Sequence, residues 1–302
     1  MASTAPSASP SSTGDQPKPN IGEILKKSGM RALGGGMAGA AAMGINVGAL
    51  MWLRTTVNYQ YRKGTTMRVA LKTLYADGGI PRFYQGLLPA LVQGPASRFG
   101  DTAANAGVIT LLDSFAETKD LPVLVKTAAA SATAASWRIF LMPVDTLKTI
   151  KQVEGKDGFK VLMAKMKIHG PGVMYHGALA AFAANLLGHY PWFATYNYMQ
   201  EALPKTDDFK LKLCRNAVIG FSASAISDTV SNSVRVVKVY KQANAEHITY
   251  PDAVKRIIAE DGLIGLFGRG LSTKIFSNGL QGLVFSVLWK LIDDHLKEKA
   301  IL

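Results

Sequence analysis

An acid and a base three residues apart form the most informative polar pair in this 302-residue chain. Asp145 and Lys148 follow Pro143 within an apolar stretch, and Gln152 comes one turn later. Residues three or four apart share one face of a helix, so the carboxylate and the ammonium group point the same way. Because proline removes a backbone donor, it kinks a helix at this place. We expect these charges to pair between helices.

The sequence contains no pattern typical of an enzyme. Histidines at 169, 176, 189, 247 and 295 have no metal-ligand spacing with Cys214 or with carboxylates. No nucleophile motif or phosphate loop is present, and the run Asp77-Gly78-Gly79 is typical of a turn. We therefore expect no catalytic residue, no metal and no cofactor.

The chain repeats itself about every 91 residues. Matching residues recur in each copy: Gln60, Gln152 and Gln242, then Gly86, Gly177 and Gly270. A fixed period of this kind indicates one structural unit used several times. We predict three repeats in one integral domain, over 25–118, 119–207 and 208–302. The Ser- and Pro-rich segment 1–24 precedes them and is expected to be disordered, because it lacks large apolar side chains.

Each repeat contains two long apolar stretches with a short amphipathic helix between them. The long stretches cover about 29–60, 87–115, 122–152, 177–202, 212–242 and 270–297, and the short helices about 65–76, 158–168 and 250–260. The long stretches exceed the ~20 residues that cross a bilayer. Charged residues make up only 18% of the chain, against about 25% in soluble domains. We predict an all-α membrane protein with six transmembrane helices in three pseudo-symmetric repeats.

The run Met142-Pro143-Val144-Asp145-Thr146-Leu147-Lys148, followed by Gln152, resembles the signature of the mitochondrial carrier family. The Asp-Gly and aromatic-x-Gly segments after each short helix resemble the second half of that signature. The resemblance covers about residues 25–298. It implies residence in the mitochondrial inner membrane, short helices on the matrix side and both termini toward the intermembrane space; peroxisomal and plastid members also exist.

The resemblance also implies a matrix gate, in which an acid on one odd-numbered helix pairs with a base on the next. The positions that match are Pro143, Asp145, Lys148, Gln152, Ser233, Arg235, Lys238 and Gln242. The first repeat has lost the proline, the acid and the base. Asp145–Lys238 is therefore the one remaining family-type pair, and Arg235 faces no aligned acid.

The gate at the cytoplasmic end departs further from the family pattern. Its aligned positions are Asn197, Gln200, Lys290 and Asp293, where amides replace charges or the signs are reversed. Amides still hydrogen-bond between helices, at about 1 kcal/mol or less each.

The family's substrate contacts lie midway along the even-numbered helices. The matching residues are uncharged: Gln93, Ala184, Asn185, Ser277 and Asn278. Arg98, His189, Lys274 and Arg138 lie close by and are further candidates, with interhelical hydrogen bonding or snorkelling as an equal alternative for the first three. The lack of a central cation argues against a multiply charged anion as the solute.

Glycines near the helix ends imply lipid sites. The resemblance places cardiolipin headgroups near Gly78, Gly86, Gly170, Gly177, Gly262 and Gly270. Free amides at a helix start attract anions, and the net charge of +13 favours anionic lipid surfaces.

Two functions fit these patterns. The first is an inner-membrane carrier that moves a small metabolite by alternating access; the sequence does not identify the solute, or whether it is exchanged or carried alone. The second is a non-transporting member of the fold, acting as a scaffold or structural subunit of a membrane complex, because both gates have lost charges. A polar interior favours the carrier, and an apolar interior favours the scaffold. No nucleic-acid motif is present.

Overall fold

The computed structural model describes residues 21–115, 117–204, 206, 208–282 and 284, and within these residues it contains helices and no strand. The α-helices are α1 (Ile21–Lys63), α2 (Met67–Phe83), α3 (Leu87–Ser114), α4 (Val123–Phe140), α5 (Met142–Glu154), α6 (Gly158–His169), α7 (Ala178–Ala202), α8 (Phe209–Ala243) and α9 (Tyr250–Gly268). A further helix covers 271–282. Most of the predicted disordered segment lies outside the described residues. Among the described helices, none is both long enough and apolar enough to cross a membrane.

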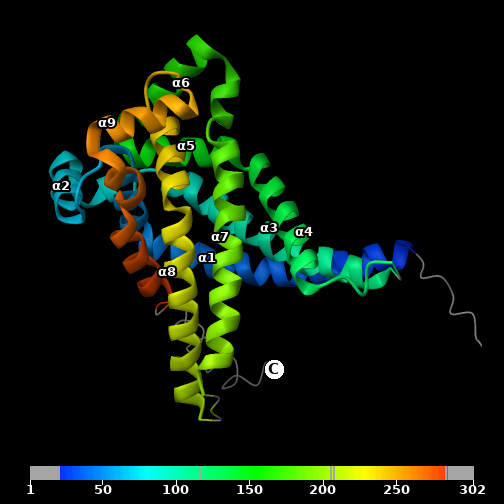
Figure 1. Ribbon diagram of the computed structural model, residues 1–302. Helices are drawn as coiled ribbons and strands as arrows, with labels where there is room; N and C mark the ends of the chain where they lie inside the picture. Colours follow the sequence, from blue (N-terminus) through cyan, green and yellow to red (C-terminus); the bar gives the residue numbers. More distant parts are fainter. Residues whose placement is uncertain (1–20, 116, 205, 207, 283, 285–302) are drawn as a thin grey trace, which may run out of the picture.

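The long helices diverge from a common end that the short helices surround. In Figure 1, α7 and α8 run side by side in one direction, while α1, α3 and α4 extend in another. The short helices α2, α6 and α9 lie at the end where the two groups meet, next to α5. This end therefore brings together the charged segments that follow the long apolar stretches.

The first long helix of a repeat is interrupted at matching places in the first and second repeats. Leu141, in the turn between α4 and α5, lies 91 residues after Leu50, where α1 has non-helical backbone angles. Pro143 lies in the first turn of α5, where a missing amide costs nothing. In the third repeat, α8 continues through Ser233. The proline explains one break, while the break at Leu50 occurs without one.

Three glycines mark the places where one repeat packs on the next. A Cβ atom at Gly86 would lie 3.0 Å from the Lys148 carbonyl oxygen, and one at Gly177 would lie 3.0 Å from Lys238 Cγ. A Cβ atom at Gly270 would lie 3.0 Å from the Tyr61 ring, which closes the third repeat onto the first. All three have positive φ angles, of 87°, 95° and 65°. Only glycine combines this backbone with such close packing.

The short helices α2 and α9 extend beyond their predicted ends. Gly79 and Gly262 have φ angles of 64° and 68° within them, so each helix turns sharply at a glycine. Gly170, with φ of 78°, ends α6. In the first repeat the left-handed residue is thus Gly79, since Gly78 has an extended φ of 176°.

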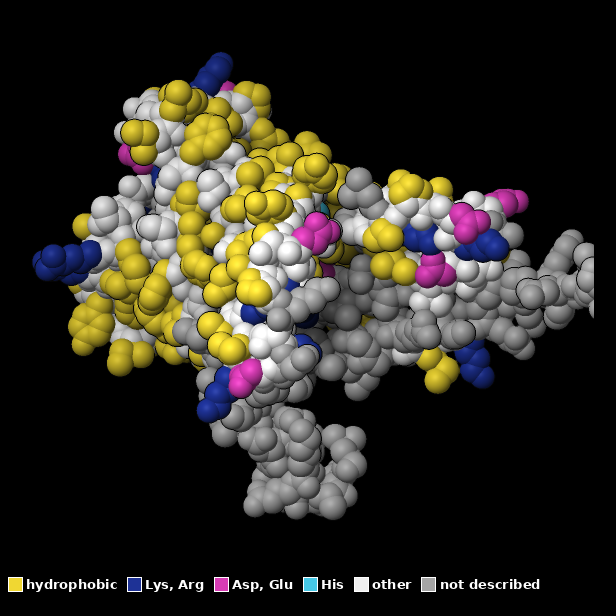
Figure 2. Space-filling view, turned by 60° about the horizontal axis from the view of Figure 1, so that its bottom comes forward, with side chains coloured by type: hydrophobic (Ala, Val, Ile, Leu, Met, Phe, Trp, Pro, Cys, Tyr) yellow, Lys and Arg dark blue, Asp and Glu magenta, His cyan; other side chains and the backbone are white. Residues whose placement is uncertain are grey.

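The outer surface is rich in apolar side chains, whereas polar ones are buried. Figure 2 shows hydrophobic side chains over much of one face, with few charged ones among them. Phe140 is 75% exposed and Leu179 is 67% exposed, whereas Asn232 is fully buried and Asp228 is 4% exposed. Buried polar groups and large exposed apolar patches are the features that depart from an ordinary globular surface. Broad exposed apolar surface marks contact with lipid or another protein.

Candidate functional site

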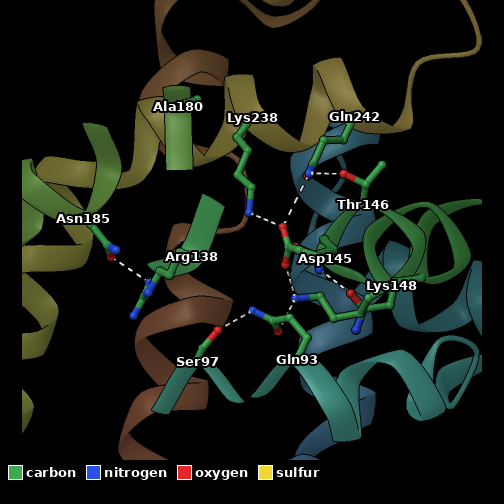
Figure 3. A network of polar contacts seen from close by, with 12 residues as sticks. Gln93, Ser97, Arg138, Asp145, Thr146, Lys148, Ala180, Asn185, Lys238 and Gln242 are labelled. Atoms are coloured by element: carbon green, nitrogen blue, oxygen red, sulfur yellow. Dashed lines mark hydrogen bonds and ion pairs between the residues drawn. The ribbon is translucent and has the colours of Figure 1, made fainter. Parts of the chain in front are cut away.

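A single carboxylate at the start of α5 connects two repeats. Asp145 is 5% exposed, and its two oxygens accept from Lys148 Nζ at 2.5 Å and from Lys238 Nζ, on α8, at 2.6 Å. Figure 3 shows both ammonium groups pointing at this carboxylate from opposite sides. The ion pair that the sequence predicted between Asp145 and Lys238 is present. Its gating role stays a prediction.

The network continues from Lys148 to α3. Lys148 Nζ also donates to Gln93 Oε1 at 2.9 Å, and Gln93 Nε2 donates to Ser97 Oγ at 2.9 Å. Gln93, a predicted substrate contact, therefore lies directly on the candidate gate (Figure 3). A solute that bonds to Gln93 would compete with its bond to Lys148.

The repeated glutamines connect neighbouring repeats at two of the three junctions. Gln242 Nε2 donates to Thr146 Oγ1 at 3.1 Å, and Gln152 Oε1 accepts from Asn58 Nδ2 at 2.5 Å. Gln60 instead donates to Thr65 in its own repeat, at 3.0 Å. Within the described part of the chain, the junction between the third and first repeats therefore lacks this contact.

Arg235 has an acidic partner that sequence alignment did not identify. It forms an ion pair with Asp228, two turns earlier on the same helix, and Asn278 also donates to Asp228. Lys274 Nζ donates to Asn278 Oδ1 at 3.0 Å. The expectation that Arg235 faces no acid holds for the aligned positions only, because Asp228 comes from outside the signature.

Arg138, a predicted cavity cation, joins three helices. Its guanidinium group contacts both oxygens of Asp101 on α3, at 3.2 and 2.5 Å, and donates to Asn185 Oδ1 on α7 at 2.7 Å. His189 Nδ1 lies 2.8 Å from Ser131 Oγ. The contact with Ser131 favours the interhelical hydrogen-bonding role for His189. Asn185 and Arg138 lie in direct contact with each other.

The remaining predicted substrate contacts differ in burial. Ala184 and Ser277 are 6% and 5% exposed. Arg98 is exposed on α3. The structure thus joins Gln93 to the gate and Asn185 to Arg138, while Lys274 and Asn278 belong to the group around Asp228.

Two of the four residues of the predicted cytoplasmic gate lie within the described part of the chain, and the role of the gate stays a prediction. Gln200 Oε1 and its backbone oxygen accept from Arg215 on α8, both at 2.6 Å. Asn197 is exposed. Lys290 and Asp293 lie outside the described residues. Arg215 takes no part in the family pattern, so no signal in the sequence singled it out.

Asp101, Asp228 and Arg54 are further polar residues of the network that the motif comparison did not assign. Each is an isolated charge within an apolar stretch, and such residues usually face a bundle interior. That rule was the available signal for these residues, but it does not identify their partners.

The start of α7 is occupied by a side chain. Tyr250 Oη, from the start of α9, accepts from the Ala180 amide at 3.4 Å. A lipid headgroup near Gly177 would have to share this amide with the phenol oxygen.

We expect stability to fall when the imidazole of His176 is protonated. Burial, aided by Lys241, Lys165 and the rings of His247 and His169, lowers the pKa of His176 from 6.5 to about 4. The stabilisation by the neutral ring is complete above pH 6.5 and is lost as the pH falls toward 4. The loss is roughly 1 kcal/mol after allowance for solvent screening at this half-buried site.

Thermal unfolding at pH 7 and pH 5 measures this effect. His176→Gln should reduce the difference between the two unfolding temperatures. An equal difference in wild type and variant would show that other groups cause the pH dependence.

Comparisons with known proteins identify the family of this chain. A family model described as mitochondrial carrier protein matches residues 119–207 and 209–300. Mitochondrial thiamine diphosphate carrier 2 of Zea mays is 27% identical over 286 residues, which cover 80% of this chain and 82% of the relative. Mitochondrial ornithine transporter 1 of Saccharomyces cerevisiae is 26% identical, over 68% and 75%. A probable chloroplastic S-adenosylmethionine carrier 2 of Arabidopsis thaliana is 31% identical, over 42% and 34%.

Proposed function

We propose that this chain, which belongs to the mitochondrial carrier protein family, moves a small solute by alternating access between two gated ends. Members of the family are transporters rather than enzymes, and the relatives indicate residence in the mitochondrial inner membrane. The family and its mode of action set the class of activity. The gates, the solute and the orientation are inferred below from the residues of this chain.

In this proposal six segments span the bilayer. They are α1, α3, α4 with α5, α7, α8 and the last apolar stretch, about 270–297. The apolar outer surface would face lipid, and the buried polar side chains would face the interior. With an even number of spans, both termini lie on one side, which we assign to the intermembrane space. The short helices α2, α6 and α9 then lie at the matrix end.

The observation that carries the proposal is the buried polar network at the matrix end. Asp145 holds two lysines from different repeats, and one of them, Lys148, also donates to Gln93, a predicted substrate contact. In this state the network closes the matrix end. Opening requires Lys238 to leave Asp145, and the exchange of ion pairs between two arrangements is a known kind of switch.

The opposite gate would close by weaker contacts. The bonds of Arg215 to Gln200 connect α8 to α7 near their ends. Because these bonds are charge-assisted, they are stronger than amide–amide contacts and compensate in part for the lost acids and bases. A chain with one strong gate and one weak gate should favour the state described here.

The alternative, a non-transporting scaffold, predicts an interior filled by apolar side chains. The contacts around Asp145, Asp228 and Arg138 support a polar interior instead. A partner complex is therefore not needed to explain the network.

We further propose cardiolipin as a bound lipid at the starts of α3 and of the helix over 271–282, where Gly86 and Gly270 precede the helices.

Uptake into liposomes tests this function. We expect the purified protein, reconstituted with cardiolipin, to exchange at least one labelled solute from a panel that includes thiamine diphosphate, S-adenosylmethionine and ornithine. Arg215→Gln should change the rate without unfolding the protein, because it loosens only the weaker gate. A folded protein that moves no solute, and that co-purifies with a membrane complex, would support the scaffold instead.

A further inference from the structure

We propose that the transported solute is an organic anion with at least two negative charges, and that its phosphate or carboxylate groups bind between Arg54 and Lys274. This inference rests on the proposed transport function and names the class of solute. It opposes the expectation from the sequence, in which the central positions carry no cation.

Cations outnumber carboxylates around the matrix end of the interior. Among the described residues of this region, the carboxylates are Asp145 and Asp228, and the cations are Arg54, Lys148, Arg235, Lys238 and Lys274. Asp145 is shared by two lysines, and Asp228 is paired with Arg235. Arg54 and Lys274 are left without a direct acidic partner among these residues.

The contacts of Arg54 are too weak to neutralise its charge. Its Nη2 atom lies 3.2 Å from Gln281 Oε1 and 3.6 Å from Met43 Sδ, and both of these acceptors are neutral. Its Nε atom is buried and has no hydrogen-bond partner. A guanidinium group has five N–H donors in a planar fork, which fits the two oxygens of a phosphate or carboxylate. Arg54 therefore has a buried N–H donor to which an anion would bind.

Lys274 lies on the same helix face as the partner of Arg54. Lys274, Asn278 and Gln281 are spaced four and three residues apart, so they follow one stripe of the last helix. Lys274 reaches Asp228 only through the amide of Asn278. Asp228 attracts the charge of Lys274, whereas Arg235, Arg54 and Lys148 are close enough to repel it. An anion placed between Arg54 and Lys274 would relieve this repulsion.

The same anion would act on the gate. Lys148 lies near Arg54 and shares Asp145 with Lys238. If a phosphate draws Lys148 toward the interior, Asp145 loses one of its two bonds. Solute binding and opening of the matrix end are then coupled through one lysine, as alternating access requires.

The test uses inorganic pyrophosphate as the probe and thermal unfolding of the whole detergent-purified protein, without lipid, as the readout. We expect a saturable rise in unfolding temperature of roughly 2–4 °C at ten times Kd. Potassium chloride at the same ionic strength and ornithine should have no such effect. Arg54→Gln and Lys274→Gln should each abolish the rise and, in the absence of pyrophosphate, leave the protein as stable or more stable.

Matched controls change the same charges elsewhere. Arg256→Gln and Lys160→Gln alter exposed residues that pair with Glu246 and Asp157, and both variants should keep the full response. An unchanged unfolding temperature with pyrophosphate, or an equal response in Arg54→Gln, would overturn the inference. So would uptake of a cation alone, which would leave the transport function standing. A response restored only by cardiolipin would assign the cations to lipid.

Discussion

Asp145→Asn should lower the unfolding temperature by on the order of 10 °C. The substitution removes the charge that holds Lys148 and Lys238, and it leaves both ammonium groups in a buried site without a counterion. Breaking a buried pair in this way costs about 3–5 kcal/mol. Differential scanning fluorimetry in detergent measures the change. Transport should also fall, because the matrix end no longer closes.

Asp157→Asn is the matched control for this prediction. Asp157 pairs with Lys160 on the surface just after α5, where both side chains are more than two-thirds exposed. Its loss should shift the unfolding temperature by less than about 2 °C, since an exposed pair contributes at most ~1 kcal/mol. Equal shifts of the unfolding temperature for the two substitutions would mean that the charge of Asp145 stabilises the fold no more than an exposed charge does.

Arg82→Met should cause the second-largest loss of stability. Arg82 is 4% exposed, and it donates to the carbonyl oxygens of Gln152 and Val153 at 3.0 and 2.7 Å. These bonds join α2 of the first repeat to the end of α5 in the second. Methionine fills similar space but leaves both carbonyls without a donor, which costs about 3 kcal/mol.

Arg68→Met makes the same chemical change at an exposed position of α2. It should leave the unfolding temperature within about 2 °C of wild type. If Arg82→Met behaves like this control, the contact between the first two repeats does not depend on the guanidinium group.

The period of the sequence predicted the long helices well. The stretches 87–115 and 177–202 correspond to α3 and α7 within one or two residues. Gly86 and Gly177 precede these helices with left-handed backbones, so the local signals were sufficient there. The break at Leu50 was not predictable in this way, because neither proline nor glycine occupies it.

The polar network could be predicted only where the signature survives. Asp145 and Lys238 were paired by their aligned positions, and their contact is present. Asp228 and Asp101 were not assigned, because their partners depend on how the helices rotate and cross. The excess of cations over carboxylates around Asp145 and Asp228 was not predicted, for the same reason. Arg54, Lys274 and Lys148 come from three repeats, and only the folded chain brings them together.

A reversible lock across the matrix end would decide whether it must open during transport. In a Cys214→Ser background, Thr146→Cys and Gln242→Cys place thiols on α5 and α8, at side chains that contact each other at 3.1 Å. A short bifunctional reagent that forms a disulfide with each thiol should block exchange of the solute found in the liposome panel, and a reductant, which cleaves both disulfides, should restore it. The single-cysteine variants should be insensitive. Undiminished exchange with the cross-link in place would contradict a gate at Asp145.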